Sequence, residues 1–197
     1  MWNRIYTTFS YEILWRAARS TLDMAEVRDP RIRVDHLSIC SILTGFLAFE
    51  GFINFVGNEI APEVWKIERK FFSRGKFRGI VGKIEYLFTL FPNAELKKGA
   101  EPYLTFKRVK DIRDNLAHNR VLHYTEMNSN DEPSLRTLWE DFDTPEKIKP
   151  ALQKLKEFAE VIRIEALKLL NDDYFASQLQ FEAFQGPVGR SEGEEVS

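Results

Sequence analysis

The segment LSICSILTGFLAFEGFINFV, residues 37–56, is the strongest indication of the fold of this 197-residue chain. Its apolar residues occur on nearly every side of a helix, which is typical of a helix at the centre of a bundle or in an interface. The segment is about long enough to cross a membrane, but Glu50 and four uncharged polar residues interrupt it, and a charge in mid-bilayer is costly. The sequence therefore predicts a buried core helix over residues 35–60 and no membrane insertion.

Apolar residues at three- and four-residue spacing predict further helices on both sides of this segment. These helices are expected at residues 8–27, 62–72, 80–91, 102–118 and 145–171, with Pro150 marking a kink in the last helix or its true start. Residues 121–139 lack a helical period and are expected to form a short hairpin with arms at 121–126 and 134–138. The sequence predicts an all-α fold, a bundle of about five helices with a short hairpin or loop insertion before the last long helix.

The composition is that of a soluble globular protein, with 44% apolar and 29% charged residues. One domain is expected over residues 1–185, followed by a disordered acidic tail over 186–197. The single cysteine, Cys40, cannot form an internal disulfide, and the N-terminus lacks the pattern of a signal peptide, so a cytoplasmic protein is expected. A net charge of −2 gives no overall attraction for nucleic acid, so any such binding requires a local basic patch.

Residues 63–83 hold the one strong basic cluster of the sequence, with seven basic and two acidic residues. The cluster is either a solvated surface or a strip that contacts RNA phosphates. Four aromatic residues lie among these charges and either stack on bases or belong to the core: Trp65, Phe71, Phe72 and Phe77. The candidate RNA-binding residues are Lys66, Arg69, Lys70, Arg74, Lys76 and Arg78.

The sequence holds no glycine-rich phosphate loop, no Cys/His metal-ligand spacing and no serine nucleophile pattern, so no metal or cofactor is expected. The remaining feature is the segment RDNLAH, residues 113–118, at the end of a predicted helix. Arg113 falls within the apolar stripe of that helix, where an unpaired charge is costly, so it must reach a carboxylate or a phosphate. Glu50 also lies in an apolar band, with Asn54 one turn later. Glu50 and Arg113 form either a structural pair or a site in which Glu50 positions Arg113 as a phosphate clamp.

His118 lies four residues after Asp114, so the two are neighbours on one helix face. The carboxylate can orient the imidazole and favour its protonated form. His118 is either a cation at the helix C-terminus or a general acid and base. Because Arg113 and His118 lie about 140° apart on an ideal helix, a site using both requires that the helix end between them or that a second subunit complete it.

Three short segments together resemble the HEPN superfamily of all-helical domains. The segment 113–118 is similar to the family's Arg, polar residue, three further residues and His; AFEGFIN, residues 48–54, is similar to its acidic, apolar second helix; and KIEYL, residues 83–87, is similar to its middle helix. The resemblance implies a homodimer in which the Arg and His of both subunits face one cleft. One departure is that the tyrosine of some toxin members, two positions after the His, is Arg120 here.

The resemblance implies a metal-independent endoribonuclease, in which the 2′-hydroxyl of RNA attacks the adjacent phosphate. His118 is then the general acid and base, Arg113 stabilises the charge on the phosphorane, and Asp114 and Asn115 orient the imidazole or the scissile group. A role as a toxin or in defence, with an antitoxin or another protein partner, follows from the resemblance alone. The alternative is a non-catalytic helical module that dimerises or binds nucleic acid, a nucleotide or a partner protein.

Overall fold

The computed structural model describes residues 10–27, 36–117, 125–127, 133–135 and 141–170. The described residues contain five long helices: α1 (Ser10–Glu26), α2 (His36–Ile60), α5 (Gly79–Leu90), α6 (Tyr103–Ala117) and α7 (Pro145–Leu170). Two one-turn helices, α3 (Pro62–Trp65) and α4 (Glu68–Phe71), connect α2 to α5. Strands β1 (Thr125–Met127) and β2 (Pro133–Leu135) pair antiparallel, with Glu126 opposite Ser134. The expected all-α class is confirmed.

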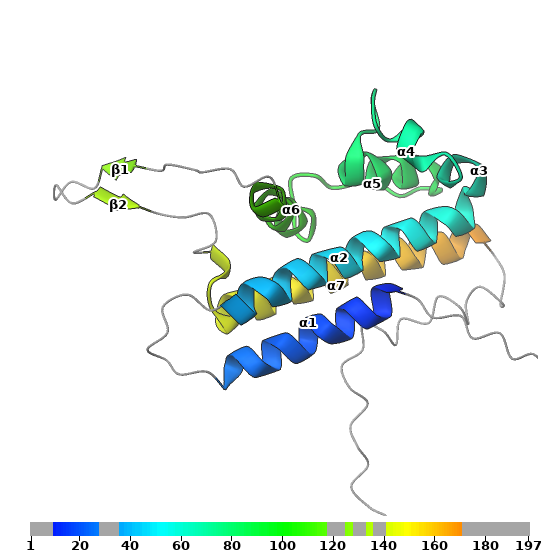
Figure 1. Cartoon of the computed structure of the whole chain (residues 1–197). Coiled ribbons are helices and arrows are strands. Elements are labelled where there is room, and N and C mark those ends of the chain that lie inside the picture. Colours follow the sequence, from blue (N-terminus) through cyan, green and yellow to red (C-terminus); the bar gives the residue numbers. More distant parts are fainter. Residues whose placement is uncertain (1–9, 28–35, 118–124, 128–132, 136–140, 171–197) are drawn as a thin grey trace, which may run out of the picture.

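Helix α2 is the centre of the bundle, as its apolar sequence predicted. It contacts α1, α3, α5, α6 and α7. Figure 1 shows α1, α2 and α7 side by side along their lengths, with α5 and α6 on the other side of α2. Half of the most apolar 18-residue window of α2 is buried within the protein. By length and composition α2 could cross a membrane, but this burial is compatible with the core helix of a soluble protein.

The core is rich in aromatic rings where α2, α6 and α7 meet. Phe49 of α2 is fully buried, and its ring centroid lies 5.4 Å from that of Phe106 in α6 and 5.5 Å from that of Phe158 in α7. Phe46, one turn earlier in α2, stacks on Phe106 at 5.8 Å. These contacts fix α6 against α2 and so determine where the polar end of α6 lies.

The α2–α1 contact is close because small residues meet there. Ala18 of α1 and Ser41 of α2 are both fully buried, and the Ser41 hydroxyl donates a 2.7 Å hydrogen bond to the Ala18 carbonyl. This bond gives the buried hydroxyl a partner, as a polar group in a core requires.

The largest difference from the sequence prediction lies at residues 62–72, where one helix was expected. The chain instead forms α3 and α4 with a turn at 66–67. Trp65 packs directly on Gly57 of α2, where an added Cβ would lie 2.0 Å from the indole ring. The turn allows both Trp65 and Phe72, which lie 5.0 Å apart between ring centroids, to reach the core. Packing of these rings therefore overrides helical continuity.

Three further expectations concern the last third of the chain. The expected hairpin is present as the paired strands β1 and β2, and the remaining residues of its expected arms, 121–124 and 136–138, lie outside the described residues. Helix α7 begins at Pro145, so Pro150 is not its true start but lies inside it. The expected tail over residues 186–197 lies outside the described residues.

Candidate functional site

Helix α2 presents a ring, a carboxylate and an amide in one row toward α5 and α6. Phe46, Glu50 and Asn54 follow one another at four-residue spacing, so they lie on the same face of the helix. The Arg113 guanidinium from α6 lies over the Phe46 ring, with its central carbon 5.1 Å from the ring centroid, and donates a hydrogen bond to the Glu50 carboxylate. The predicted pairing of Glu50 with Arg113 is therefore present.

Arg113 is held from a second side by its own helix. Its second terminal nitrogen lies 2.8 Å from Oδ1 of Asp114, whose Oδ2 accepts a 2.6 Å hydrogen bond from Lys110 one turn earlier. The Arg113 side chain is 27% exposed and that of Glu50 is 24% exposed. Arg113 is thus paired with carboxylates and also accessible from one side.

Burial raises the pKa of the Glu50 carboxyl above its ordinary value. The positive charges of Arg113 and Lys83 oppose this effect, while the negative charge of Asp114 adds to it. The direction means that taking the ionised carboxylate out of water costs more than its cationic neighbours return.

A cavity of about 380 Å³ opens beside this pair. Its walls come from α2, α4, α5 and α6, and its charged lining residues are Glu50, Glu68, Arg69, Lys83 and Arg113. The cavity therefore brings together Glu50 and Asn54, Arg113, and Arg69 of the basic cluster, which the sequence analysis had chosen on separate grounds.

Lys83 of α5 lines the cavity, although it is not among the site residues predicted from the sequence, where it belongs to the basic cluster 63–83 and to the segment 83–87. Its ammonium donates hydrogen bonds to Oδ1 of Asn54 at 2.6 Å and to Oε2 of Glu68 at 3.0 Å, and its side chain is only 15% exposed. The signal was the same as for Arg113: the helical period places Lys83 beside Leu87 and Ile80 in the apolar stripe of its helix.

The other predicted site residues lie apart from the cavity or outside the described residues. Asn115 donates its side-chain amide to the carbonyl of Asp111 at 2.7 Å, within its own helix. Asp114 contacts Arg113 and Lys110 but does not line the cavity. His118 follows the last residue of α6 and lies outside the described residues, so its predicted neighbourhood with Asp114 stays a prediction.

The six predicted RNA-binding side chains are all exposed: Lys66, Arg69, Lys70, Arg74, Lys76 and Arg78. A shallow hollow of about 300 Å³ is formed by residues 66–70 and shares Glu68 and Arg69 with the cavity. The basic surface of the connection between α2 and α5 therefore continues to the edge of the cavity.

The aromatic residues of this connection belong mainly to the core. Trp65 and Phe72 are 6% and 4% exposed, and Phe71 and Phe77 are partly buried and pack against Tyr86 of α5. The core interpretation of Trp65 and Phe72 is confirmed, and stacking of bases on these two rings is not available.

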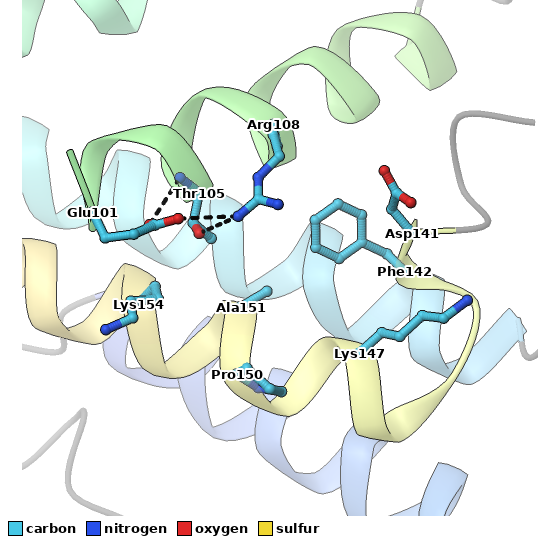
Figure 2. Close-up of a pocket in the computed structure, with 9 residues that line it drawn as sticks. All are labelled: Glu101, Thr105, Arg108, Asp141, Phe142, Lys147, Pro150, Ala151 and Lys154. Carbon is cyan, nitrogen blue, oxygen red and sulfur yellow. Dashed lines mark hydrogen bonds and ion pairs between the residues drawn. The ribbon is translucent and has the colours of Figure 1, made fainter. Parts of the chain in front are cut away.

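A second cavity, of about 480 Å³, lies between α6 and the start of α7 and holds none of the predicted site residues (Figure 2). Its cations are engaged by carboxylates of the protein. Arg108 lies 3.1 Å from Glu101 and 2.8 Å from the hydroxyl of Thr105, and Lys147 lies 2.8 Å from Asp143. The Arg108–Glu101 pair is largely exposed, and Lys147 is exposed on its side of the second pair, so the cavity resembles an ordinary charged surface.

Within the described part of the chain, no group of three or more His, Cys, Asp or Glu side chains is placed to hold a metal ion. Comparison of the chain with protein-family models, with curated proteins and with solved structures gives no match. The family resemblance of the segment 113–118 therefore stays a prediction.

Proposed function

We propose that this protein is a metal-independent endoribonuclease whose active site is built around Arg113 and His118. The observation that carries the proposal is the setting of Arg113. Its guanidinium is fixed by Glu50, Asp114 and the Phe46 ring, yet it lines an accessible cavity. A cation that is already fixed in position stabilises a developing anion without the cost of ordering itself during the reaction.

The proposed reaction needs no cofactor because RNA supplies the nucleophile. The 2′-oxygen forms a bond to the adjacent phosphorus, the bond from phosphorus to the 5′-oxygen breaks, and the products are a cyclic phosphate and a 5′-hydroxyl. His118 takes the proton of the 2′-hydroxyl and returns a proton to the leaving 5′-oxygen. Arg113 stabilises the negative charge of the phosphorane, and Asp114 and Asn115 orient the imidazole or the scissile group.

The exposed basic side chains from Lys66 to Arg78 support RNA as the substrate. Arg69 lines the cavity, and the hollow formed by residues 66–70 adjoins it. The whole chain has a net charge of −2, so attraction to phosphate is local to this surface. On an ideal helix Arg113 and His118 would lie about 140° apart, so a site that uses both requires that the helix end between them or that a second subunit complete it. The homodimer that the family resemblance implies is the second of these arrangements. An antitoxin or another protein partner in a defence system belongs to the same proposal.

A second candidate function is a non-catalytic module that dimerises or binds a nucleotide, a nucleic acid or a partner protein. The pairing of Arg113 with two carboxylates favours it, because such a network also braces α6 against α2. In this case the segment 113–118 serves the fold and not a reaction.

Cleavage in EDTA separates the two functions. Wild type, His118→Ala and the control His36→Ala are incubated with a labelled structured RNA, and the product ends are identified. We expect cyclic-phosphate ends from wild type and from His36→Ala, and none from His118→Ala, which should still bind RNA and give a native far-UV spectrum. Equal RNA cleavage, or none, by wild type and His118→Ala would remove the endoribonuclease and leave the binding module.

A further inference from the structure

We propose that the cavity beside Arg113 is a subsite for one RNA backbone phosphate next to the scissile one, and that Lys83 is the residue that binds it. This inference rests on the proposed function, because it concerns how the same site holds its substrate. It adds a residue from α5 to a site so far built from α2 and α6.

The Lys83 side chain is held in a fixed position at the wall of the cavity. Its side chain is only 15% exposed, and the ammonium nitrogen lies 5.7 Å from the centroid of the Phe72 ring, so a cation–π contact holds the ammonium where it lines the cavity. A side chain held in this way loses little freedom when a ligand binds. Lys83 therefore differs from the exposed basic residues of 66–78, which must be ordered by the RNA.

The hydrogen-bond partners of the Lys83 ammonium leave one of its donors for a ligand. An ammonium group has three N–H donors, and among the described residues Asn54 and Glu68 accept two of them. The remaining donor can reach a ligand in the cavity. Asn54 acts as a positioning residue, because its amide oxygen sets the direction of the ammonium without adding a negative charge, whereas the Glu68 carboxylate competes with an anion for the same ammonium.

The charged residues that line the cavity include more cations than anions. Three cations, Arg69, Lys83 and Arg113, line it from three different elements, against the two carboxylates of Glu50 and Glu68. Such an excess of converging cations favours an anion, and the phosphodiester groups of RNA are the anions that a ribonuclease meets. Arg113 at one wall would contact the scissile phosphate, so a phosphate at Lys83 is a neighbouring one along the strand.

Glu68 allows a test in which two substitutions are expected to change RNA affinity in opposite directions. Its carboxylate pairs with Lys83 but also faces the space that a phosphate would enter, and its side chain is 34% exposed. If Lys83 binds phosphate, removing Lys83 weakens RNA binding while neutralising Glu68 strengthens it. If Lys83 only braces α5 against α4, folded Lys83→Gln keeps the salt slope of wild type, because no phosphate contact is lost.

The experiment measures binding without cleavage. The probe is a short fluorescein-labelled oligoribonucleotide whose 2′-hydroxyls are all methylated, so that the attacking group is blocked. Fluorescence anisotropy gives its affinity for wild type, Lys83→Gln, Glu68→Gln and Lys149→Gln over a range of salt concentrations. Lys149→Gln is the matched control, because Lys149 also forms one carboxylate pair, at 2.9 Å to Glu26, but between α7 and α1 on the other side of α2.

We expect Lys83→Gln to weaken binding about tenfold, which corresponds to about 1.4 kcal/mol. We also expect it to reduce the slope of log affinity against log salt by about 0.7, the value for one phosphate contact on a single strand. Glu68→Gln should bind several-fold more tightly than wild type, and Lys149→Gln should match wild type in affinity and slope. Far-UV spectra and melting temperatures show whether each variant is folded.

Three results would overturn the subsite: no binding of the probe by wild type, an affinity of folded Lys83→Gln equal to that of wild type, or weaker binding by Glu68→Gln. Because Glu68→Gln tests the sign separately, the inference can be refuted even if Lys83→Gln does not fold. Failure of the ribonuclease proposal is distinct from these results. Wild type that binds the probe through Lys83 but leaves unmodified RNA intact refutes the enzyme and retains the subsite.

Discussion

Replacing Glu50 and Arg113 one at a time should have unequal effects on stability. Arg113 has two carboxylate neighbours, Glu50 and Asp114. Among the described residues, the Glu50 carboxylate accepts a side-chain hydrogen bond from Arg113 alone. Arg113→Gln therefore leaves the Glu50 carboxylate with only the more distant charge of Lys83 to compensate it. Glu50→Gln leaves Arg113 with Asp114, and the new amide oxygen can still accept a hydrogen bond from it.

The expected magnitudes follow from burial. Removing one partner of a buried ion pair costs about 3–5 kcal/mol, and leaving a buried polar group unsatisfied costs about 1–3 kcal/mol. Since both side chains are about one quarter exposed, we expect Arg113→Gln to lower the free energy of unfolding by about 2 kcal/mol. Glu50→Gln should be within about 0.5 kcal/mol of wild type at pH 7, or more stable, because it removes the cost of burying a carboxylate.

The same reasoning predicts a dependence on pH. Burial raises the pKa of Glu50 in the folded protein, so the folded state binds a proton more readily than the unfolded state. The stability that protonated Glu50 gives to wild type is fully present below the unfolded pKa, about 4.3, and is lost as pH rises through the higher folded pKa. The stability of wild type relative to Glu50→Gln should therefore fall as pH rises above about 4.3.

Urea unfolding followed by far-UV circular dichroism at several pH values between 4 and 7 measures both effects. Equal losses of unfolding free energy in Glu50→Gln and Arg113→Gln at pH 7 would contradict the expected difference between the two variants. That result would mean that the ionised pair is net favourable and that the pKa of Glu50 lies below its ordinary value.

Two further predictions concern the core and use the same unfolding assay. Phe49→Ala, at a fully buried ring, should cost about 3–5 kcal/mol, whereas Leu47→Ala, at a side chain that is 45% exposed in the same helix, should cost less than about 1 kcal/mol; similar losses would contradict the described burial. Gly57→Ala should cost about 1–3 kcal/mol because its new methyl group would lie 2.0 Å from the Trp65 ring, whereas Gly99→Ala, with open space around it, should be nearly neutral; equal stability of the two variants would show that α3 does not pack on α2 in this way.

The long helices and the pairing of two charges within apolar stripes could be predicted from the sequence. The five long helices follow from apolar residues at the helical period, which is a local property that each segment carries whatever its neighbours are. Arg113 and Glu50 stood out because each is a charge in an apolar stripe, and such a charge requires a partner of opposite sign. Both interpretations of these residues, a structural pair or a phosphate clamp, place Glu50 against Arg113, and the structure contains that contact.

The residues that each helix face contacts depend on the tertiary packing. The helical period shows that Lys83 faces inward, but not that its ammonium meets Asn54 and Glu68, because that contact depends on how α4 and α5 are placed against α2. The break between α3 and α4 has the same origin: Trp65 reaches the core through its contact with Gly57, eight residues earlier, and helical continuity yields to that packing. Local periodicity fixes the direction of a side chain on its own helix, while the packing of distant segments fixes its partners.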